Sequence, residues 1–117
     1  MSDESITPVR GRPTWQQTML RIKDPKKSLE FYKSLGFTHI DTFDFPQWKF
    51  SLYFMTTLPE GETYNLTPGS KEAHDYLWTM DGVALELTHN HGTEEQDGPV
   101  YHPGNQEKDG FGHIAVK

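Results

Sequence analysis

Between residues 17 and 90, the order of hydrophobic and polar side chains predicts four strands and one main helix. Alternation of apolar and polar positions is typical of a strand that has one face in the core. The segments that match this pattern, or that carry the aromatic and β-branched residues of strands, are 17–22, 37–44, 50–55 and 83–90. Phe45, Pro46 and Gln47 form the predicted turn between the second and the third of these segments.

The main helix is predicted directly after the first strand. Asp24 can accept a hydrogen bond from the free N–H groups of a first helical turn, and Pro25 fills the first helical position, where proline is favoured. Gly36 supplies the left-handed residue that commonly ends a helix. The apolar residues that recur at helical spacing between these signals are Leu29, Tyr32 and Leu35.

The remaining segments complete an α+β chain with the order β-α-β-β-β and one extra strand. Residues 58–81 form a long connection rich in turn residues, and a short helix fits within residues 70–80. The predicted divisions are a flexible leader at 1–13, a βαβββ module at 14–91, a linker at 92–110 and an extra strand at 111–117.

Strand alternation assigns Glu86 to one face of the predicted sheet, although a carboxylate is seldom buried without a partner. The residues of its strand that share this face are Ala84, Thr88 and Asn90. The opposite, apolar face is expected to pack on the helix. Gln17 and Arg21 share one face of the first strand, and this face coincides with the Glu86 face if the two strands curve together.

Three residues offer a candidate metal site: Gln17, Glu86 and His113. They supply an amide oxygen, a carboxylate oxygen and an imidazole nitrogen, a mixed set that suits a borderline divalent ion such as zinc, nickel or cobalt. The alternative is that each is an exposed polar group or forms an internal hydrogen bond. Spacing alone does not decide between these interpretations.

Other histidines are not expected to be metal ligands. His89 falls on the apolar face of its strand, so we expect a packed or rim histidine. His39, His74 and His102 lie in or near predicted turns, where we expect them to be solvated.

Composition narrows the class of partner. The chain has 117 residues, which fits one small domain, and its net charge of −6 without a basic cluster argues against nucleic acid and anionic membranes as partners. It contains no cysteine and therefore has no disulfide framework. Because no secretion signal or bilayer-length apolar stretch is visible, we expect a cytoplasmic location and small molecules or proteins as partners.

Four blocks of sequence closely resemble the glyoxalase I (lactoylglutathione lyase) family of the vicinal oxygen chelate superfamily. They are "QQTMLRIKDPKKSLEFY", "DFPQWKFSLYF", "LELTHNHGTE" and "GFGHIAV", and the likeness extends over residues 15–117. The resemblance implies βαβββ modules with curved mixed sheets that pair to enclose a metal ion. It also implies metal-dependent isomerisation of the hemithioacetal of methylglyoxal and glutathione to S-lactoylglutathione. A non-catalytic module that binds glutathione adducts or another metabolite is the alternative.

The resemblance also implies roles for individual residues. Gln17, Glu86 and His113 match metal ligands, with zinc preferred and nickel or cobalt also found in such sites, and Glu86 would move the proton. Arg21 and Asn90 match residues that hold glutathione, and Thr88 lies near them. The residues that match the apolar pocket for the aldehyde substituent are Phe45, Leu52 and Phe54.

Two positions depart from the family pattern. The resemblance makes residues 111–117 the first strand of a truncated second module, so the family's second glutamate ligand has no counterpart here. It implies a second module, supplied either by a homodimer or by tandem fusion in a longer chain. A self-standing short protein that pairs through its open sheet edge is the competing interpretation. Asp109 stands where the family commonly has an arginine that contacts glutathione, so it should weaken binding of that anion, with Lys108 offsetting part of the effect.

Overall fold

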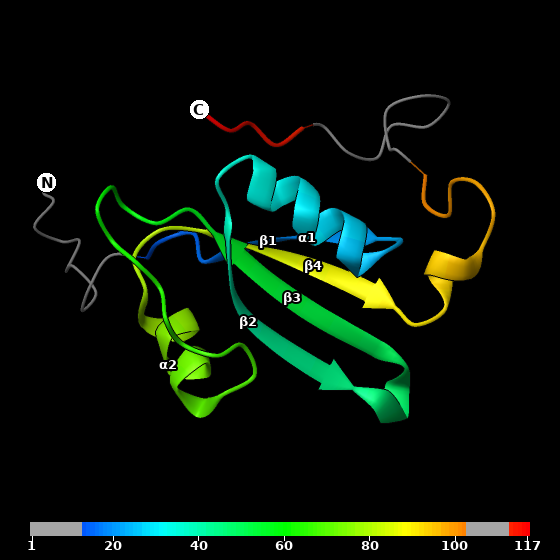
Figure 1. Ribbon diagram of the computed structural model, residues 1–117, viewed down its shortest axis with the longest axis horizontal. Coiled ribbons are helices and arrows are strands. Elements are labelled where there is room, and N and C mark those ends of the chain that lie inside the picture. Colours follow the sequence, from blue (N-terminus) through cyan, green and yellow to red (C-terminus); the bar gives the residue numbers. More distant parts are fainter. Residues whose placement is uncertain (1–12, 103–112) are drawn as a thin grey trace, which may run out of the picture.

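The computed structural model describes residues 13–102 and 113–117, which form an α+β fold around one mixed sheet (Figure 1). The strands are β1 (Gln17–Ile22), β2 (Thr38–Phe45), β3 (Phe50–Thr56) and β4 (Ala84–Asn90), and the helices are α1 (Pro25–Ser34) and α2 (Lys71–Thr79). Strand order is β1-β4-β3-β2, with β1 parallel to β4 and the other neighbours antiparallel. The predicted fold class and the βαβββ order are therefore confirmed.

Helix α1 begins and ends at the predicted signals. The Asp24 side chain accepts a hydrogen bond from the Lys26 N–H at 3.0 Å, and Pro25 is the first helical residue. At the other end, the Gly36 N–H donates to the Lys33 carbonyl at 3.0 Å, and Gly36 has a φ of 98°. This left-handed residue turns the chain towards β2.

The two faces of the sheet carry separate hydrophobic clusters. The cluster on the α1 face contains Ile22, Met55, Leu85 and Leu87, with Leu29 and Tyr32 packed against it. The cluster on the α2 face contains Ile40, Phe54, Leu77 and Ala84. Each helix thus covers part of one face, and the strands β3 and β4 contribute to both clusters.

The long connection between β3 and β4 carries α2, so the predicted short helix is confirmed. Ser70 caps it, because its hydroxyl oxygen accepts a hydrogen bond from the Ala73 N–H at 3.1 Å. With nine residues, α2 is almost as long as α1, which has ten, so the expectation of one main helix understates the helical content.

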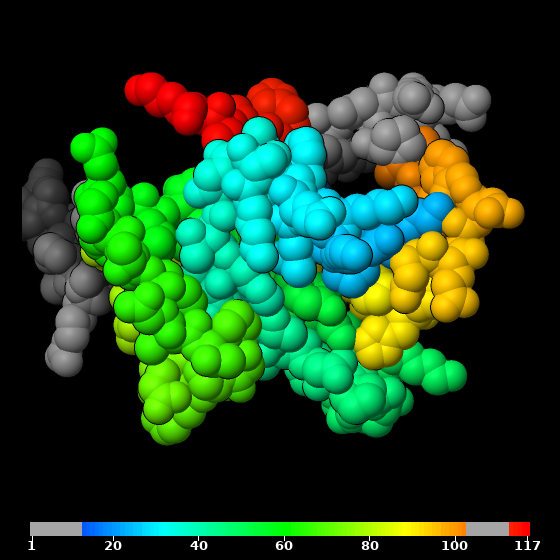
Figure 2. Space-filling model, in the orientation of Figure 1, coloured from blue at the N-terminus to red at the C-terminus, as the bar shows by residue number. Residues whose placement is uncertain are grey.

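The strand predicted at 111–117 is not formed in its described part. Residues 113–117 lie outside any strand, and residues 114–117 lie on the α1 side, where they line a cavity together with that helix (Figures 1 and 2). A strand needs a hydrogen-bonded neighbour, and this segment pairs with neither β1 nor β2, the two edges of the sheet.

Other predicted segments are only partly described. Residues 1–12 of the leader and 103–112, which include most of the linker's second half, lie outside the described residues. The first part of the linker contains a short 3-10 turn at Thr93–Glu95. No helix in the described parts of the chain is long and apolar enough to cross a bilayer.

Candidate functional site

Gln17 and Glu86 lie side by side on the face of the sheet opposite α1. In the parallel pairing of β1 with β4, Gln17 is opposite Ala84 and Met19 is opposite Glu86. The Gln17 Nε2 group donates a hydrogen bond to Glu86 Oε1. The shared face expected for these two side chains is therefore present, while their role as metal ligands stays a prediction.

Glu86 is a half-buried carboxylate whose environment disfavours its charge. Burial raises the pKa of Glu86 above its ordinary value, and the hydrogen bond from Thr88 acts in the opposite direction. The Thr88 hydroxyl lies 3.4 Å from Glu86 Oε2. Within the described residues no basic side chain forms an ion pair with Glu86. A divalent cation would reverse this desolvation effect, so the Gln17–Glu86 pair fits one part of a metal site.

His113 does not lie beside this pair in the structure. It is exposed, and the residues directly after it lie on the α1 side of the sheet, whereas Gln17 and Glu86 are on the other face. The three predicted ligands are not assembled, because the segment of His113 is not a strand of this sheet. Among the described residues, no three or more His, Asp or Glu side chains form a group able to hold a metal ion.

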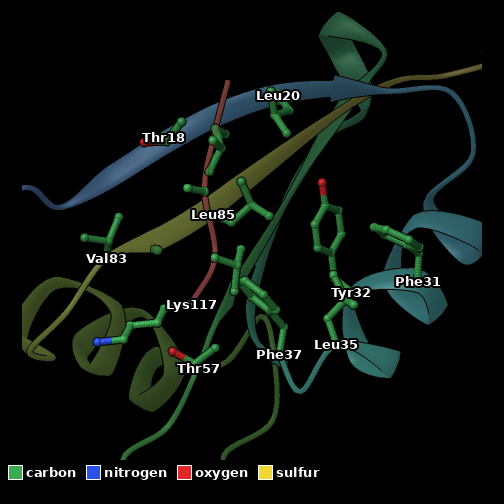
Figure 3. A pocket seen from close by; sticks show the side chains of 14 residues that line it. Thr18, Leu20, Phe31, Tyr32, Leu35, Phe37, Thr57, Val83, Leu85 and Lys117 are labelled. Atoms are coloured by element: carbon green, nitrogen blue, oxygen red, sulfur yellow. The ribbon is translucent and has the colours of Figure 1, made fainter. Parts of the chain in front are cut away.

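Residues 114–117, α1 and the sheet line an open cavity of about 770 Å³ (Figure 3). Its lining is mostly apolar and includes Leu20, Phe31, Tyr32, Phe37, Leu85 and Val116. None of the predicted catalytic, metal-binding or substrate-binding residues lines it. The candidate site is therefore the opposite face of the sheet.

Arg21, Thr88 and Asn90 form the polar end of the candidate-site face. Arg21 is exposed and pairs in register with Thr88, which is 8% exposed. Asn90 follows on the same face and donates through Nδ2 to the Tyr101 hydroxyl at 3.0 Å. Sequence reasoning missed Tyr101, since no local pattern connects residue 101 with β4.

The predicted apolar residues share this face with Glu86. Phe54 is opposite Glu86 in the pairing of β3 with β4, and Leu52 is opposite Thr88. Phe45 lies at the end of β2, opposite Phe50. Phe54 is only 2% exposed and belongs to the core, whereas Leu52 and Phe45 are half-buried.

Sequence reasoning also missed Phe43, whose ring joins this apolar surface. The Phe43 and Phe54 rings are 5.7 Å apart in an edge-to-face arrangement. Alternation along the predicted second strand would have found it, because Phe43 is two residues from Phe45.

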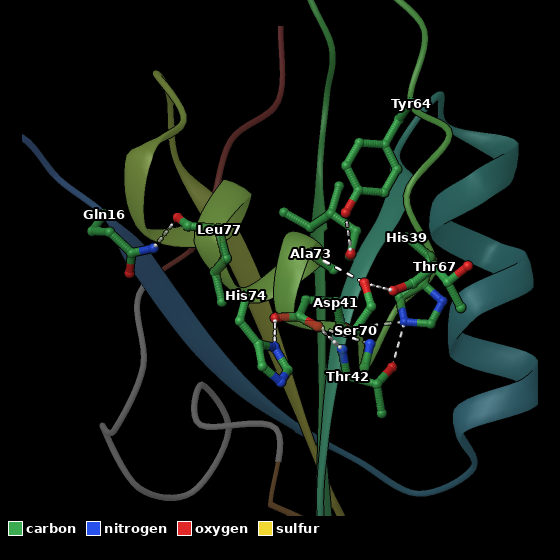
Figure 4. Close-up of polar contacts among 12 residues, drawn as sticks. Gln16, His39, Asp41, Thr42, Tyr64, Thr67, Ser70, Ala73, His74 and Leu77 are labelled. Carbon is green, nitrogen blue, oxygen red and sulfur yellow. Dashed lines mark hydrogen bonds and ion pairs between the residues drawn. The ribbon is translucent and has the colours of Figure 1, made fainter.

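Two of the histidines expected to be solvated form hydrogen bonds with neighbouring side chains instead. His74 Nδ1 is 2.6 Å from Oδ2 of the fully buried Asp41 (Figure 4). His39 Nε2 is 2.7 Å from the Thr42 hydroxyl, and burial lowers the pKa of His39. Both partners, Asp41 and Thr42, belong to β2. A prediction from the turn residues around each histidine does not consider these partners. The packed position expected for His89 is confirmed: it is 5% exposed.

The chain belongs to the Glyoxalase/Bleomycin resistance protein/Dioxygenase superfamily, whose family model matches residues 14–117. A lactoylglutathione lyase of Pseudomonas putida is 44% identical over 111 residues, which cover 93% of this chain and 61% of that protein. A lactoylglutathione lyase of Schizosaccharomyces pombe is 41% identical over 103 residues, which cover 87% of this chain and 29% of that protein. The resemblance to glyoxalase I is therefore confirmed.

A solved structure shows the same fold. The trypanothione-dependent glyoxalase I of Leishmania major is similar with a TM-score of 0.55 and 25% identity, over 81% of this chain and 52% of that one. The chain thus spans 61%, 29% and 52% of the length of these three relatives.

Proposed function

We propose that this chain supplies one half of a metal-dependent lactoylglutathione lyase site, which isomerises the hemithioacetal of methylglyoxal and glutathione to S-lactoylglutathione. The observation that carries the proposal is the contact between Gln17 and Glu86 on the open face of the sheet. Relatives that carry the name lactoylglutathione lyase at 41–45% identity support the same reaction class.

Gln17 and Glu86 would hold the divalent metal, for which zinc is preferred and nickel or cobalt fits the same donors. When bound, the metal would act as a Lewis acid that lowers the cost of removing a carbon-bound proton. Glu86 would accept that proton and return it to the adjacent carbon. The charged form that a bound cation favours is the form of Glu86 that can accept a proton.

Substrate would extend along the face from the polar end to the apolar residues. Arg21, Asn90 and Thr88 would hold the glutathione part, since an exposed guanidinium and an amide suit its carboxylates and peptide groups. Phe45 and Leu52 would contact the substituent derived from the aldehyde, and the buried Phe54 would support this surface from the core. These contacts orient the substrate and contribute no proton transfer.

A second module would complete the site, either from another copy of the chain or from a tandem module in a longer polypeptide. The described residues bring two donors together, and a metal ion of this class needs about four protein or solvent ligands. The segment of His113 lies outside the sheet. In the completed site, His113 would supply a further metal ligand. The greater length of the relatives is consistent with this arrangement.

A second candidate is a non-catalytic module that binds glutathione adducts. One observation favours it: within the described residues the donors remain two, short of a full metal site. This alternative uses the same face, but Glu86 would transfer no proton in it. It therefore predicts that replacing Glu86 leaves adduct affinity unchanged and that there is no turnover to lose.

The decisive experiment combines metal analysis with an assay of thioester formation from methylglyoxal and glutathione. For the zinc-loaded protein we expect turnover that falls at least about 1,000-fold in Glu86→Gln, as expected for loss of both a ligand and a proton acceptor. Glu60→Gln, an exposed carboxylate in the loop after β3, is the matched control and should keep full activity. Bound S-substituted glutathione without any turnover would favour the binding module instead.

A further inference from the structure

Beside the candidate-site face lies a row of rings that includes a histidine from α2. The His74 ring is stacked on Phe43, with centroids 4.2 Å apart and planes 12° apart. The Phe43 ring is nearly parallel to that of Phe45, 7° off with centroids 6.5 Å apart, and it meets Phe54 edge to face. We call His74, Phe43 and Phe45 the aromatic row.

Asp41 fixes the orientation of the His74 ring. Its Oδ2 atom is 2.6 Å from His74 Nδ1, and its Oδ1 atom accepts from the N–H groups of Thr42 at 2.8 Å and Gly69 at 3.0 Å (Figure 4). The Asp41 side chain is fully buried, so these bonds do not compete with water. A ring that is stacked on one side and bonded at one nitrogen has little rotational freedom.

The position of Asp41 relates His74 to the candidate site. Asp41 pairs with Phe54 across β2 and β3, and Phe54 pairs with Glu86 across β3 and β4. Two strand spacings, about 10 Å in total, therefore separate the Asp41 and Glu86 positions on the same row of the sheet. His74 covers the α2 end of the apolar surface that begins at Phe54.

We propose that His74 is a specificity-determining residue, which sets the size of the apolar substituent that the candidate site accepts. This inference rests on the proposed function. A substituent that starts near Glu86 and runs over Leu52 and Phe43 meets the fixed His74 ring, and the ring stops longer groups. The side chain is 32% exposed, so a ligand can reach it.

The same geometry selects the chemical class of the substituent. Leu52, Phe43 and Phe45 offer hydrocarbon surface, and the Asp41 carboxylate lies directly behind His74. An uncharged apolar group gains by burial there, whereas a carboxylate at the far end of the substituent would lose its hydration against these rings. The size limit set by His74 therefore applies to an uncharged alkyl or aryl substituent.

The test compares the affinity of two stable adducts that differ only in the size of the substituent. S-methylglutathione is too short to reach His74, whereas S-(4-phenylbenzyl)glutathione extends past it. In His74→Ala we expect the longer adduct to bind about tenfold more tightly, as for burial of about two further methylene groups, and the methyl adduct to bind unchanged. His74→Phe keeps a ring at this position and should restore the wild-type ratio.

His91→Ala serves as the matched control. His91 is a partly exposed histidine that contacts Ser51 and Asp44 away from the aromatic row, so the affinity ratio should not change. If His74→Ala changes both affinities equally, or neither, the specificity role is overturned while the proposed function stands. If the wild-type protein binds neither adduct, both the proposed function and this inference fail.

A second measurement covers the case in which His74→Ala does not fold. The imidazole resonances of His74 in the wild-type protein should shift on addition of the phenylbenzyl adduct and stay unchanged with the methyl adduct. Binding of the phenylbenzyl adduct without any shift at His74 would contradict the inference. This readout needs no variant and no catalytic activity.

Discussion

At the scale of single residues, Glu86 shows how burial and ligand binding oppose each other. In the metal-free chain its carboxylate is half-buried, accepts bonds from Gln17 and Thr88, and has a raised pKa. A bound cation would favour the charged form that burial disfavours. The pH dependence of stability should therefore reveal whether a metal occupies this position.

We predict that the metal-free chain loses stability as pH rises above about 4.5, the ordinary pKa of this carboxyl. Because the folded state holds the proton more tightly than the unfolded state, the contribution of Glu86 is complete below that pH and is lost as pH rises through the raised pKa. Urea unfolding at several pH values would measure the effect. Glu86→Gln should flatten this part of the profile, and saturating zinc should reverse its slope. An identical profile in the variant would contradict the assignment.

Local patterns assign side chains to a face only within one strand. Alternation puts Glu86 and Thr88 on one face of β4, whereas Gln17 joins them only because β1 pairs with β4. The contact of His74 was not predicted, because its partner Asp41 is 33 residues away in the sequence. No property of the segment around residue 74 indicates a buried carboxylate on another strand.

At the scale of elements, the strands and α1 could be predicted because each carries its own signal. Asp24 and Gly36 mark the two ends of α1, and alternation marks β1, β3 and β4. The strand predicted at the C-terminal end carries the same local signal yet is absent from residues 113–117. Strand formation depends on a pairing partner, and one segment of sequence does not identify that partner.

The contact between α2 and β2 provides a prediction at this scale. Asp41 connects β2 to the loop at Gly69 and to α2 at His74. We expect Asp41→Ala to lower the free energy of unfolding by about 3 kcal/mol or more, because two N–H groups and an imidazole lose a buried acceptor. Asp41→Asn keeps one acceptor oxygen and should cost less.

Hydrogen exchange would locate the effect of these variants. In Asp41→Asn, amide protection should fall first in α2 and in the loop before it, while α1 stays protected, because α1 packs on the other face of the sheet. Ser34→Ala, at the exposed end of α1, is a control that leaves Asp41 untouched. Uniform loss of protection in Asp41→Asn would show that α2 is not a separate unit.

At the scale of the whole molecule, α2 covers only part of the candidate-site face and leaves the rest open. Met19 lies between Gln17 and Arg21 on the edge strand β1 and is 39% exposed, and Trp48 beside β3 is 66% exposed. Exposed apolar residues around a polar site are typical of an interface. The family pattern predicts a second module, and local periodicity does not identify which chain would supply it.

This open face leads to a prediction about assembly. If a second module covers it, the zinc-loaded 117-residue chain should associate as a dimer with one metal ion per site, which native mass spectrometry would detect. Met19→Lys places a charge on the covered face and should weaken the dimer at least about tenfold, because the charge would be desolvated without a partner. Leu35→Lys, a similarly exposed apolar residue on the α1 side, should leave the dimer intact. Dissociation by Leu35→Lys with no effect of Met19→Lys would place the contact on the α1 face, where it could not complete the site of Gln17 and Glu86.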